Sequence, residues 1–404
     1  MSDFGFLEKL LDGAEVEWLP LEKVTDYEQP TKYLVESKNY DDLFNTPVLT
    51  AGKTFILGYT DETTGIYEAS KSPTIIFDDF TTANKWVDFD FKAKSSAMKM
   101  ITSSDDQKFN IKYLYYWLNT LPSGLVDGDH KRQWIGTLSK KLVPIPCPDD
   151  PEKSLAIQGE IVRILDSFTQ LTAELTAELA ARKKQYNHYR DQLLTFEDAE
   201  VKWKTLDEVA SDFGRGKSKH RPRNDERLYG GTIPFIQTGD IRSAGHAITK
   251  YTQTYSDFGL RQSKRWPKGT LCITIAANIA ETSILDFDAC FPDSVIGFVA
   301  DPEETSSDYV EYLLQSIKRK LEEKGKEKSS AQSNINLGTF AQLKLPFPPL
   351  KEQARIVSIL DKFDTLTTSL REGLPREIAL RQQQYEYYRD LLLSFPKPKE
   401  AVEA

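Results

Sequence analysis

Apolar residues in the middle of the chain recur at the spacing of one helix face. They step by three or four positions at Ile157, Ile161, Ile164, Phe168, Leu171 and Leu175. That spacing places the side chains in one stripe on an α-helix. Asp150-Pro151-Glu152 supplies a capping residue, a proline at the first helical position and an acid beside the helix dipole. The pattern predicts one helix from Pro151 to Phe196, about 65 to 70 Å long at 1.5 Å per residue.

A second copy of this pattern lies near the end of the chain. Residues 161–168 (IVRILDSF) recur as 356–363 (IVSILDKF), and residues 182–196 share nine of fifteen positions with 381–395. Average composition predicts roughly one identity in such a stretch. A shorter repeat precedes it, with Ala14–Trp18 similar to Ala199–Trp203. The chain is therefore two similar halves, each a globular region followed by a helical segment.

A helix this long needs a partner to cover its apolar stripe. We expect that partner to be the second copy, running antiparallel to the first as a coiled coil. The alternative is two independent helices, each packed in a bundle within its own domain. The second copy carries four additional residues, Glu372–Pro375, that include two helix breakers. They predict a kink near 373–375, with Pro375 restarting the helix.

The two globular halves read as mixed α/β. In the first half, residues 73–77 and 86–91 predict strands and 111–121 a helix; in the second half, 233–237 and 270–275 predict strands and 309–320 a helix. We expect an α+β protein with pseudo-twofold symmetry. Its domains are a first globular domain (1–148), a central helix (149–197), a second globular domain (198–348), a distal helix (349–396) and a tail (397–404).

The composition of the chain does not change this prediction of the fold. The formal net charge of −9 argues mildly against a nucleic-acid partner, but the basic residues cluster, six of them between Arg215 and Arg223 and four between Arg261 and Lys268. Solvated loops are the alternative explanation of such clusters. Three scattered cysteines and four unpaired histidines predict neither disulfides nor a metal site. We read neither a signal peptide nor an apolar run long enough to cross a bilayer, and expect a cytoplasmic protein.

Taken together, these features resemble the specificity subunits of type I restriction–modification enzymes (the HsdS family). The resemblance rests on two dissimilar globular regions, each followed by a helix of the form IVxILDxF…YxxYRDxLLxF, and covers nearly the whole chain. Residues 234–241 (PFIQTGDI), 269–278 and 289–294 look like motifs of one type of target-recognition domain, and 46–53 and 75–82 like another. The repeated Leu-Thr-Ala-Glu unit at 171–174 and 175–178 is similar to that of the IC subgroup.

The resemblance implies a bipartite, asymmetric double-stranded DNA target, with one half-site for each recognition domain and the helices setting the spacer between them. It further implies two methyltransferase subunits, which methylate adenine N6, and restriction subunits that cleave DNA with ATP. S-adenosylmethionine, ATP and Mg are then expected on those partners, with none on this chain. Four tyrosines on the helices are candidates for docking the methyltransferase: Tyr186, Tyr189, Tyr385 and Tyr388. Packing against the recognition domains is the alternative for them.

DNA contacts are expected from polar and basic residues of the two domains, because phosphate contacts position a protein and base contacts give it sequence preference. In the first domain the candidates are Gly52, Lys53, Asp79, Thr81, Thr82, Lys85, Ser95, Ser96, Lys99, His130, Lys131 and Arg132. In the second domain they are Arg215, Lys217, Lys219, Arg221, Thr238, Asp240, Arg242, Asn278, Gln332, Ser333 and Asn334. Contact with solvent alone is the alternative for any one basic residue.

No catalytic motif emerges. The Asn/Asp-Pro-Pro-aromatic motif of adenine methyltransferases is absent, and residues 214–218 (GRGKS) lack the first glycine of a P-loop because Ser211 stands there. We therefore expect no catalytic site on this chain. Two other classes stay open at this point: an enzyme acting alone, and a coiled-coil scaffold or other DNA-binding module without a role in restriction.

Overall fold

The computed structural model describes residues 9–52, 54–122, 137–197, 201–276, 280–327, 337–369 and 372–396. These residues form two compact units, one of Met1–Glu174 with Ala379–Ala404 and one of Leu175–Ile378. The division falls inside helix α4 (Pro151–Leu193), between the two Leu-Thr-Ala-Glu units. Each unit thus contains one globular domain and parts of both repeated helical segments.

The first unit is built on two small sheets. β2 (Thr25–Glu28), β8 (Met98–Ser103), β5 (Thr74–Asp78) and β6 (Asn84–Val87) form an antiparallel sheet in that order. β4 (Ile56–Thr60), β3 (Thr46–Leu49) and β7 (Lys92–Ala93) form the other. β1 (Val16–Pro20) pairs with β9 (Leu142–Pro146), and the short helices are α2 (Leu21–Val24), the 3₁₀ turn η1 (Pro30–Tyr33) and α3 (Ile111–Leu118). The unit is α+β.

The second unit repeats the framework around a different sheet. Five strands run in the order β11 (Ala210–Arg215), β19 (Val295–Ala300), β16 (Leu271–Thr274), β17 (Thr282–Leu285) and β13 (Ala247–Ile248). The strand pairs are β12 (Tyr229–Pro234) with β14 (Thr254–Tyr255), β15 (Arg265–Trp266) with β18 (Ala289–Cys290), and β10 (Lys202–Lys204) with β20 (Leu345–Phe347). The helical elements are η3 (Asp207–Val209), η4 (Glu226–Leu228), α5 (Thr238–Ala244), α6 (Asp257–Arg261), α7 (Ser307–Glu327) and α8 (Leu337–Ala341).

The predicted helices and strands are confirmed, but their first and last residues differ from the prediction. The first helical copy is continuous over the 43 residues of α4, three residues shorter than predicted. Residues 88–91 and 235–237, predicted as strand ends, lie outside the strands, which end at Val87 and Pro234. Within these segments Phe91 and Phe235 form only isolated bridges, to Tyr67 and Cys290, so the strand pairing does not continue through them.

The second helical copy is divided into α9 (Leu350–Thr368) and α10 (Leu374–Leu392). Gly373, at the start of α10, has a φ of +80°, and a Cβ there would lie 2.5 Å from the carbonyl oxygen of Thr365. Its own carbonyl accepts a hydrogen bond from the Glu377 amide (3.2 Å). Glycine is required here because a side chain would collide with the end of α9.

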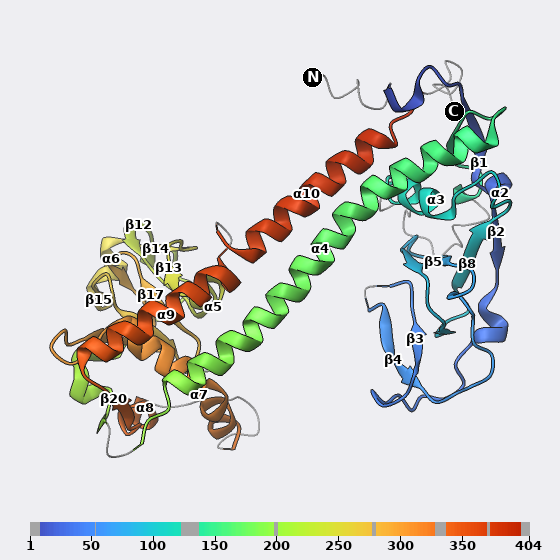
Figure 1. Ribbon diagram of the computed structural model, residues 1–404. Coiled ribbons are helices and arrows are strands. Elements are labelled where there is room, and N and C mark those ends of the chain that lie inside the picture. The colour runs from blue at the N-terminus through green and yellow to red at the C-terminus, as the bar shows by residue number, and fades with distance from the viewer. Residues whose placement is uncertain are drawn as a thin grey trace. The chain divides into compact units, whose positions relative to one another are not determined.

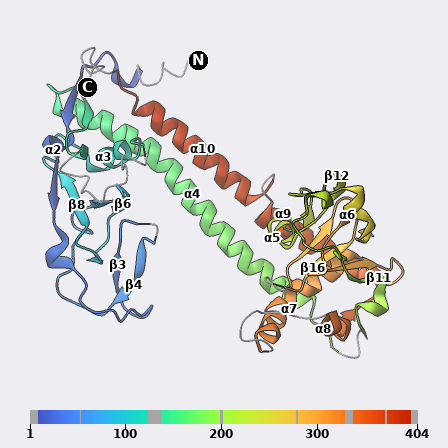
Figure 2. The ribbon, with the colours of Figure 1, turned by 180° about the vertical axis from the view of Figure 1, so that it is seen from behind.

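The two repeated segments pack against each other within each unit. In the first unit Phe168 on α4 stacks on Tyr388 on α10, with ring centroids 5.2 Å apart. In the second unit Phe363 on α9 packs on Tyr189 on α4, at 5.8 Å. Phe168 and Phe363 are equivalent residues of the repeat, as are Tyr189 and Tyr388. The same contact therefore occurs twice with the copies exchanged. Figures 1 and 2 show α10 lying beside the first half of α4.

The sheets and helices of the two units confirm the α+β class. The ring contacts confirm that the two copies pair in an equivalent way in each unit, and they exclude two independent helices. In the first unit, Leu392, Leu393 and Phe395 enter the core that also contains Ile157 and Ile161. The end of one copy thus meets the beginning of the other, which is an antiparallel pairing. The predicted apolar stripe is buried only at its start, since Ile161 is fully buried whereas Leu171 is 36% exposed.

An equivalent hydrogen bond attaches each domain to the helix that follows it. Tyr116 on α3 donates to Asp166 (2.5 Å), and the equivalent Tyr312 on α7 donates to Asp361 (2.7 Å). Burial is the main cause that raises the pKa of both phenols, so both hold their protons and act as donors at neutral pH. Each copy of the Ile-Leu-Asp motif therefore binds its own domain.

We expect Ile161→Ala to lower the free energy of unfolding by about 2 to 5 kcal/mol, because it leaves a cavity in a core where Ile161 has no exposed surface. Urea-induced unfolding measures the change. Ile56→Ala is the matched control, since Ile56 is 37% exposed. Equal losses in the two variants would contradict the placement of Ile161.

Candidate nucleic-acid interface

A basic loop between β11 and η4 forms one side of the candidate interface in the second unit. It begins at Gly216, whose amide donates to the Val295 carbonyl (2.9 Å). A Cβ at Gly216 would lie 2.2 Å from the carbonyl oxygen of Phe291. Only glycine allows the chain to pass this close to the neighbouring backbone. The loop therefore leaves the sheet at a fixed point.

The backbone of this loop is held by polar side chains beneath it. Gln262 accepts hydrogen bonds from the amides of Lys219 (2.5 Å) and His220 (3.0 Å). Ser263 donates to the carbonyl of Lys217 (2.7 Å). These hydrogen bonds involve only backbone atoms of Lys217 and Lys219. The side chains of both residues take no part in them and are exposed.

The arginines of the loop have different roles. Arg221 donates to the carbonyls of Ser218 (2.6 Å) and His220 (2.8 Å), so it closes the loop on itself. Arg223 donates to Asp293 (2.5 Å), which fixes its direction and balances its charge. Both side chains are tied to neighbouring groups of the protein, yet both remain about half exposed.

The two basic clusters of the sequence differ in how many of their side chains form ion pairs. In the cluster at 261–268, Lys264, Arg265 and Lys268 pair with Asp212, Asp288 and Asp286. Within the described ranges no ion pair involves Arg215, Lys217, Lys219 or Arg242, and all four are exposed. Arg261 of the second cluster is exposed as well, and no ion pair involves it within the described residues. The uncompensated charge lies on these four residues and on Arg261, where phosphate groups would be attracted.

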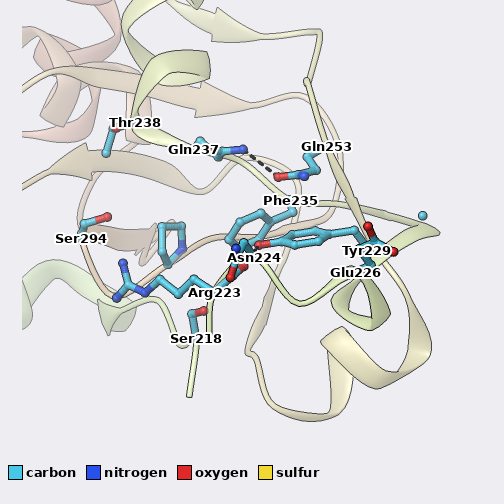
Figure 3. A pocket seen from close by; sticks show the side chains of 12 residues that line it. Ser218, Arg223, Asn224, Glu226, Tyr229, Phe235, Gln237, Thr238, Gln253 and Ser294 are labelled. Atoms are coloured by element: carbon cyan, nitrogen blue, oxygen red, sulfur yellow. Dashed lines mark hydrogen bonds between the residues drawn. The ribbon is translucent and has the colours of Figure 1, made fainter. Parts of the chain in front are cut away.

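A pocket of about 800 Å³ opens beside the loop (Figure 3). Its walls come from separate segments of the second unit: the basic loop with the start of η4, the strand β12, the turn into α5, the residue before β14 and the turn before β19. The polar groups that line it include Arg223, Asn224, Gln237, Thr238, Gln253 and Ser294. Tyr229 and Phe235 supply aromatic surface. Amides, a guanidinium and aromatic rings are the groups that contact base edges and stacked bases.

The sequence predicted only part of this pocket. Thr238 was a candidate, and Arg223 and Gln237 lie inside the basic cluster and the PFIQTGDI motif without having been chosen. Ser294 likewise ends the motif-like stretch 289–294 without having been chosen. Gln253 and Asn224 stand in segments with no distinguishing pattern, so sequence alone gave no signal for these two. Their place in the pocket follows from the fold, which brings residues up to 76 positions apart to one cavity.

Asp240 is a correction to the predicted DNA contacts. Its side chain is only 7% exposed, and it accepts hydrogen bonds from the Gln237 amide (2.8 Å) and the Thr252 hydroxyl (3.3 Å). It caps α5, where a carboxylate satisfies an amide that has no helical partner. Asp240 therefore positions the pocket wall instead of contacting DNA.

The first unit also gathers predicted residues around one cavity, of about 390 Å³. Gly52, Thr81, Thr82 and Lys85 line it, together with Asn84 and Asn119, which were not predicted. Asp78 builds the turn that presents them, since its carboxylate accepts from the amides of Phe80 (2.9 Å) and Thr81 (2.8 Å). Ser95 and Ser96 are exposed outside this cavity.

Asp79 and Lys99 are further corrections. The two side chains are 1% exposed each and form an ion pair at 3.4 Å. Lys99 also lies over the ring of Tyr27, with its nitrogen 4.5 Å from the centroid. A buried pair of this kind holds the strand ends together and has no surface for DNA.

Eight predicted contacts lie outside the described residues: Lys53, His130, Lys131, Arg132, Asn278, Gln332, Ser333 and Asn334.

The four tyrosines predicted to dock a partner fall into two pairs. Tyr186 donates to Gln315 (3.1 Å), and Tyr385 packs on Tyr116 with centroids 6.2 Å apart, so both rings are used inside their units. Burial raises the pKa of Tyr385 to about 12. Tyr189 and Tyr388 each keep 39% of their surface exposed beside the Phe363 and Phe168 rings. Exposed surface for a partner is therefore found at Tyr189 and Tyr388.

A half-buried histidine fixes the far end of α5. His246, just after the helix, forms ion pairs with Asp308 (3.1 Å) and Glu311 (2.5 Å) of α7 and stacks on Tyr312. Hydrogen bonds to Asp308 and then to Glu311 raise the pKa of His246 to about 10, so it is a cation at neutral pH. Burial raises the pKa of Glu311, and Asp364 of α9 lies near enough to repel it. The protonated histidine connects the pocket wall to the helical framework.

The comparisons with known proteins agree with this structure. The type I restriction modification DNA specificity domain matches residues 199–380. The chain is 54% identical over 407 residues to the specificity subunit of the type I restriction enzyme EcoR124I/EcoR124II of Escherichia coli, covering 99% of each chain. It is 33% identical over 418 residues to the EcoprrI specificity subunit of Escherichia coli, covering 92% of this chain and 93% of that one.

A solved structure has the same fold. The S subunit of a type I restriction–modification system from M. genitalium matches with a TM-score of 0.58 and 15% identity, over 96% of this chain and 98% of that one. The two chains thus share one fold over nearly their whole lengths. The chain belongs to the family of type I restriction enzyme specificity subunits.

Among the described residues, no helix has the length and apolar character needed to cross a membrane, and no three His, Cys, Asp or Glu side chains are grouped so that they could hold a metal ion.

We expect the stabilising effect of His246 to depend on pH. Its pKa in the folded protein lies above the ordinary value of 6.5, so its contribution is fully present below about pH 6.5 and is lost as the pH rises toward 10. The difference in free energy of unfolding between the wild type and His246→Gln should therefore shrink over that range in urea titrations. His188→Gln, at an exposed position of α4, is the control. A difference that stays constant with pH would contradict the charged cluster.

Proposed function

We propose that the protein is the DNA sequence-specificity subunit of a type I restriction–modification complex. It binds a bipartite, asymmetric double-stranded DNA target, one half-site at each recognition domain. In this way it directs adenine-N6 methylation by two methyltransferase subunits and ATP-dependent cleavage by restriction subunits. The observation that carries the proposal is the 54% identity to a specificity subunit over the full length of both chains.

The two cavities support an asymmetric target. The cavity of the first unit presents Thr81, Asn84 and Lys85, and that of the second presents Arg223, Gln237 and Gln253. Different donors and acceptors complement different base edges. A protein with two unlike reading surfaces on a repeated framework fits a target whose two halves differ.

The repeated helical contacts support two identical partners. Tyr189 and Tyr388 occupy equivalent positions, pack on equivalent phenylalanines and are equally exposed. A surface that occurs twice about a pseudo-twofold axis binds the same partner twice. We propose that these two tyrosines contribute to the docking sites of the two methyltransferase subunits.

We propose that α4 contributes to the spacing between half-sites. Its middle contains two consecutive Leu-Thr-Ala-Glu units, and one such unit adds about 6 Å to a helix. Duplex DNA advances about 3.4 Å per base pair. The number of units would then select the length of the spacer, with some bending to absorb the difference.

Catalysis is assigned to the partner subunits. S-adenosylmethionine, ATP and Mg are expected there, and this chain is proposed to have no catalytic site of its own. The sequence supports this division, because it contains neither the base-binding motif of adenine methyltransferases nor a complete P-loop.

We expect the double variant Lys217→Glu, Lys219→Glu to bind duplex DNA more weakly and with less dependence on salt. Each phosphate contact contributes roughly 0.9 to the slope of log affinity against log salt, so losing two should reduce the slope by about 2. Titrations of the assembled methyltransferase complex with its duplex measure it. Lys268→Glu is the control, because Asp286 already pairs with Lys268 at 2.7 Å. An unchanged slope would contradict phosphate contact by this loop.

Methylation mapping tests the proposed function itself. Cells that express this chain with its methyltransferase subunit should carry N6-methyladenine at one split motif of two unlike halves. Cells with the methyltransferase alone are the control. Absence of a split motif, together with absence of affinity for any duplex, would favour a coiled-coil scaffold.

A further inference from the structure

Two glutamines from different segments meet at the pocket of the second unit. The side-chain amide of Gln237, before α5, donates to the side-chain oxygen of Gln253, before β14, at 2.8 Å (Figure 3). The two residues are 16 positions apart, and both line the 800 Å³ pocket. We refer to them as the glutamine pair.

The backbones beneath the glutamine pair are held on both sides. The Phe235 amide donates to the Gln253 carbonyl (2.9 Å), which joins the two segments. Asp240 accepts from the amide of Gln237 and from the hydroxyl of Thr252, the neighbour of Gln253. One buried carboxylate thus fixes both segments, and Phe235 stacks on the buried ring of Tyr255 at 4.0 Å behind them.

The bond between the two amides fixes their rotation. A single exposed glutamine turns freely and offers its donor and acceptor in many directions, at an entropic cost on binding. In the pair, the nitrogen of one amide faces the oxygen of the other, so the remaining donors and acceptors point in set directions. A glutamine amide placed in this way matches adenine, accepting from N6 and donating to N7 in the major groove.

We propose that the glutamine pair is a specificity-determining element that reads one adenine of the half-site bound by the second domain, with Asp240 as its positioning residue. The inference rests on the proposed function and specifies its chemistry at this pocket. The exposed cations Lys217 and Lys219 on the neighbouring loop hold the phosphates, and the uncharged pair discriminates the base.

The experiment compares methylation rates of the assembled methyltransferase complex on matched duplexes. The wild-type motif is mapped first, and each A·T pair of the second half-site is then replaced by G·C in turn. The variants are Gln237→Ala, Gln253→Ala and both together. Gln342→Ala, at an exposed position after α8, is the matched control.

The expected result is that both single variants lose discrimination at the same A·T position, by roughly 5- to 150-fold, which is the range for a bidentate base contact. The double variant should lose no more than the stronger single variant, because the two amides act as a unit. Discrimination at the first half-site and in Gln342→Ala should be unchanged. Asp240→Asn keeps an acceptor and should retain discrimination, whereas Asp240→Ala should lose it at that position.

Three results would overturn the inference: unchanged discrimination in both single variants, losses at unrelated positions, or additive losses in the double variant. If Gln253→Ala abolishes methylation altogether, Gln237→Ala decides, because its side chain is exposed and its removal leaves the core intact. The wild-type mapping is a separate readout. If the wild type gives no split motif, the proposed function itself fails.

Discussion

The structure depends on one contact made twice. A phenylalanine that follows the Ile-Leu-Asp motif of one helical copy packs on a tyrosine near the end of the other copy, and the reverse contact occurs in the other unit. Each globular domain is bonded to the helix that follows it, through Tyr116 and Asp166 or through Tyr312 and Asp361. Because the start of one copy is covered by the end of the other, neither recognition domain has a complete core from its own half of the sequence.

The fold could be predicted largely from this repeat. Nine identities in fifteen positions and the stepping of Ile157, Ile161 and Ile164 are local signals, and they led to the helices and to their pairing. The extent to which each side chain of the stripe is buried was harder to predict. Leu171 continues the apolar stripe in sequence but is exposed, since the spacing of residues records their direction on a helix and does not record whether a partner covers them.

The candidate site was harder to predict, for two physical reasons. Charged residues look alike in sequence whether they are exposed or paired: Asp79 and Lys99 neutralise each other below the surface, whereas Lys217 and Lys219 extend into solvent. Residues such as Gln253 and Ser294 gain their role only when separate segments meet at one pocket. The net charge of −9 was also a poor guide, because many basic side chains are paired with aspartates and only a few determine the local potential.

The most direct test of the account is a double-mutant cycle on Phe168 and Tyr388, repeated on the equivalent Phe363 and Tyr189, with alanine at each position. The free energies of unfolding of the wild type, the single variants and the double variant give the coupling energy of each pair. Reciprocal packing of the copies predicts a favourable coupling of about 0.5 to 1.5 kcal/mol in both pairs, as expected for packed aromatic rings. Additive losses in either pair would show that the copies do not pack on each other there, and would contradict the account.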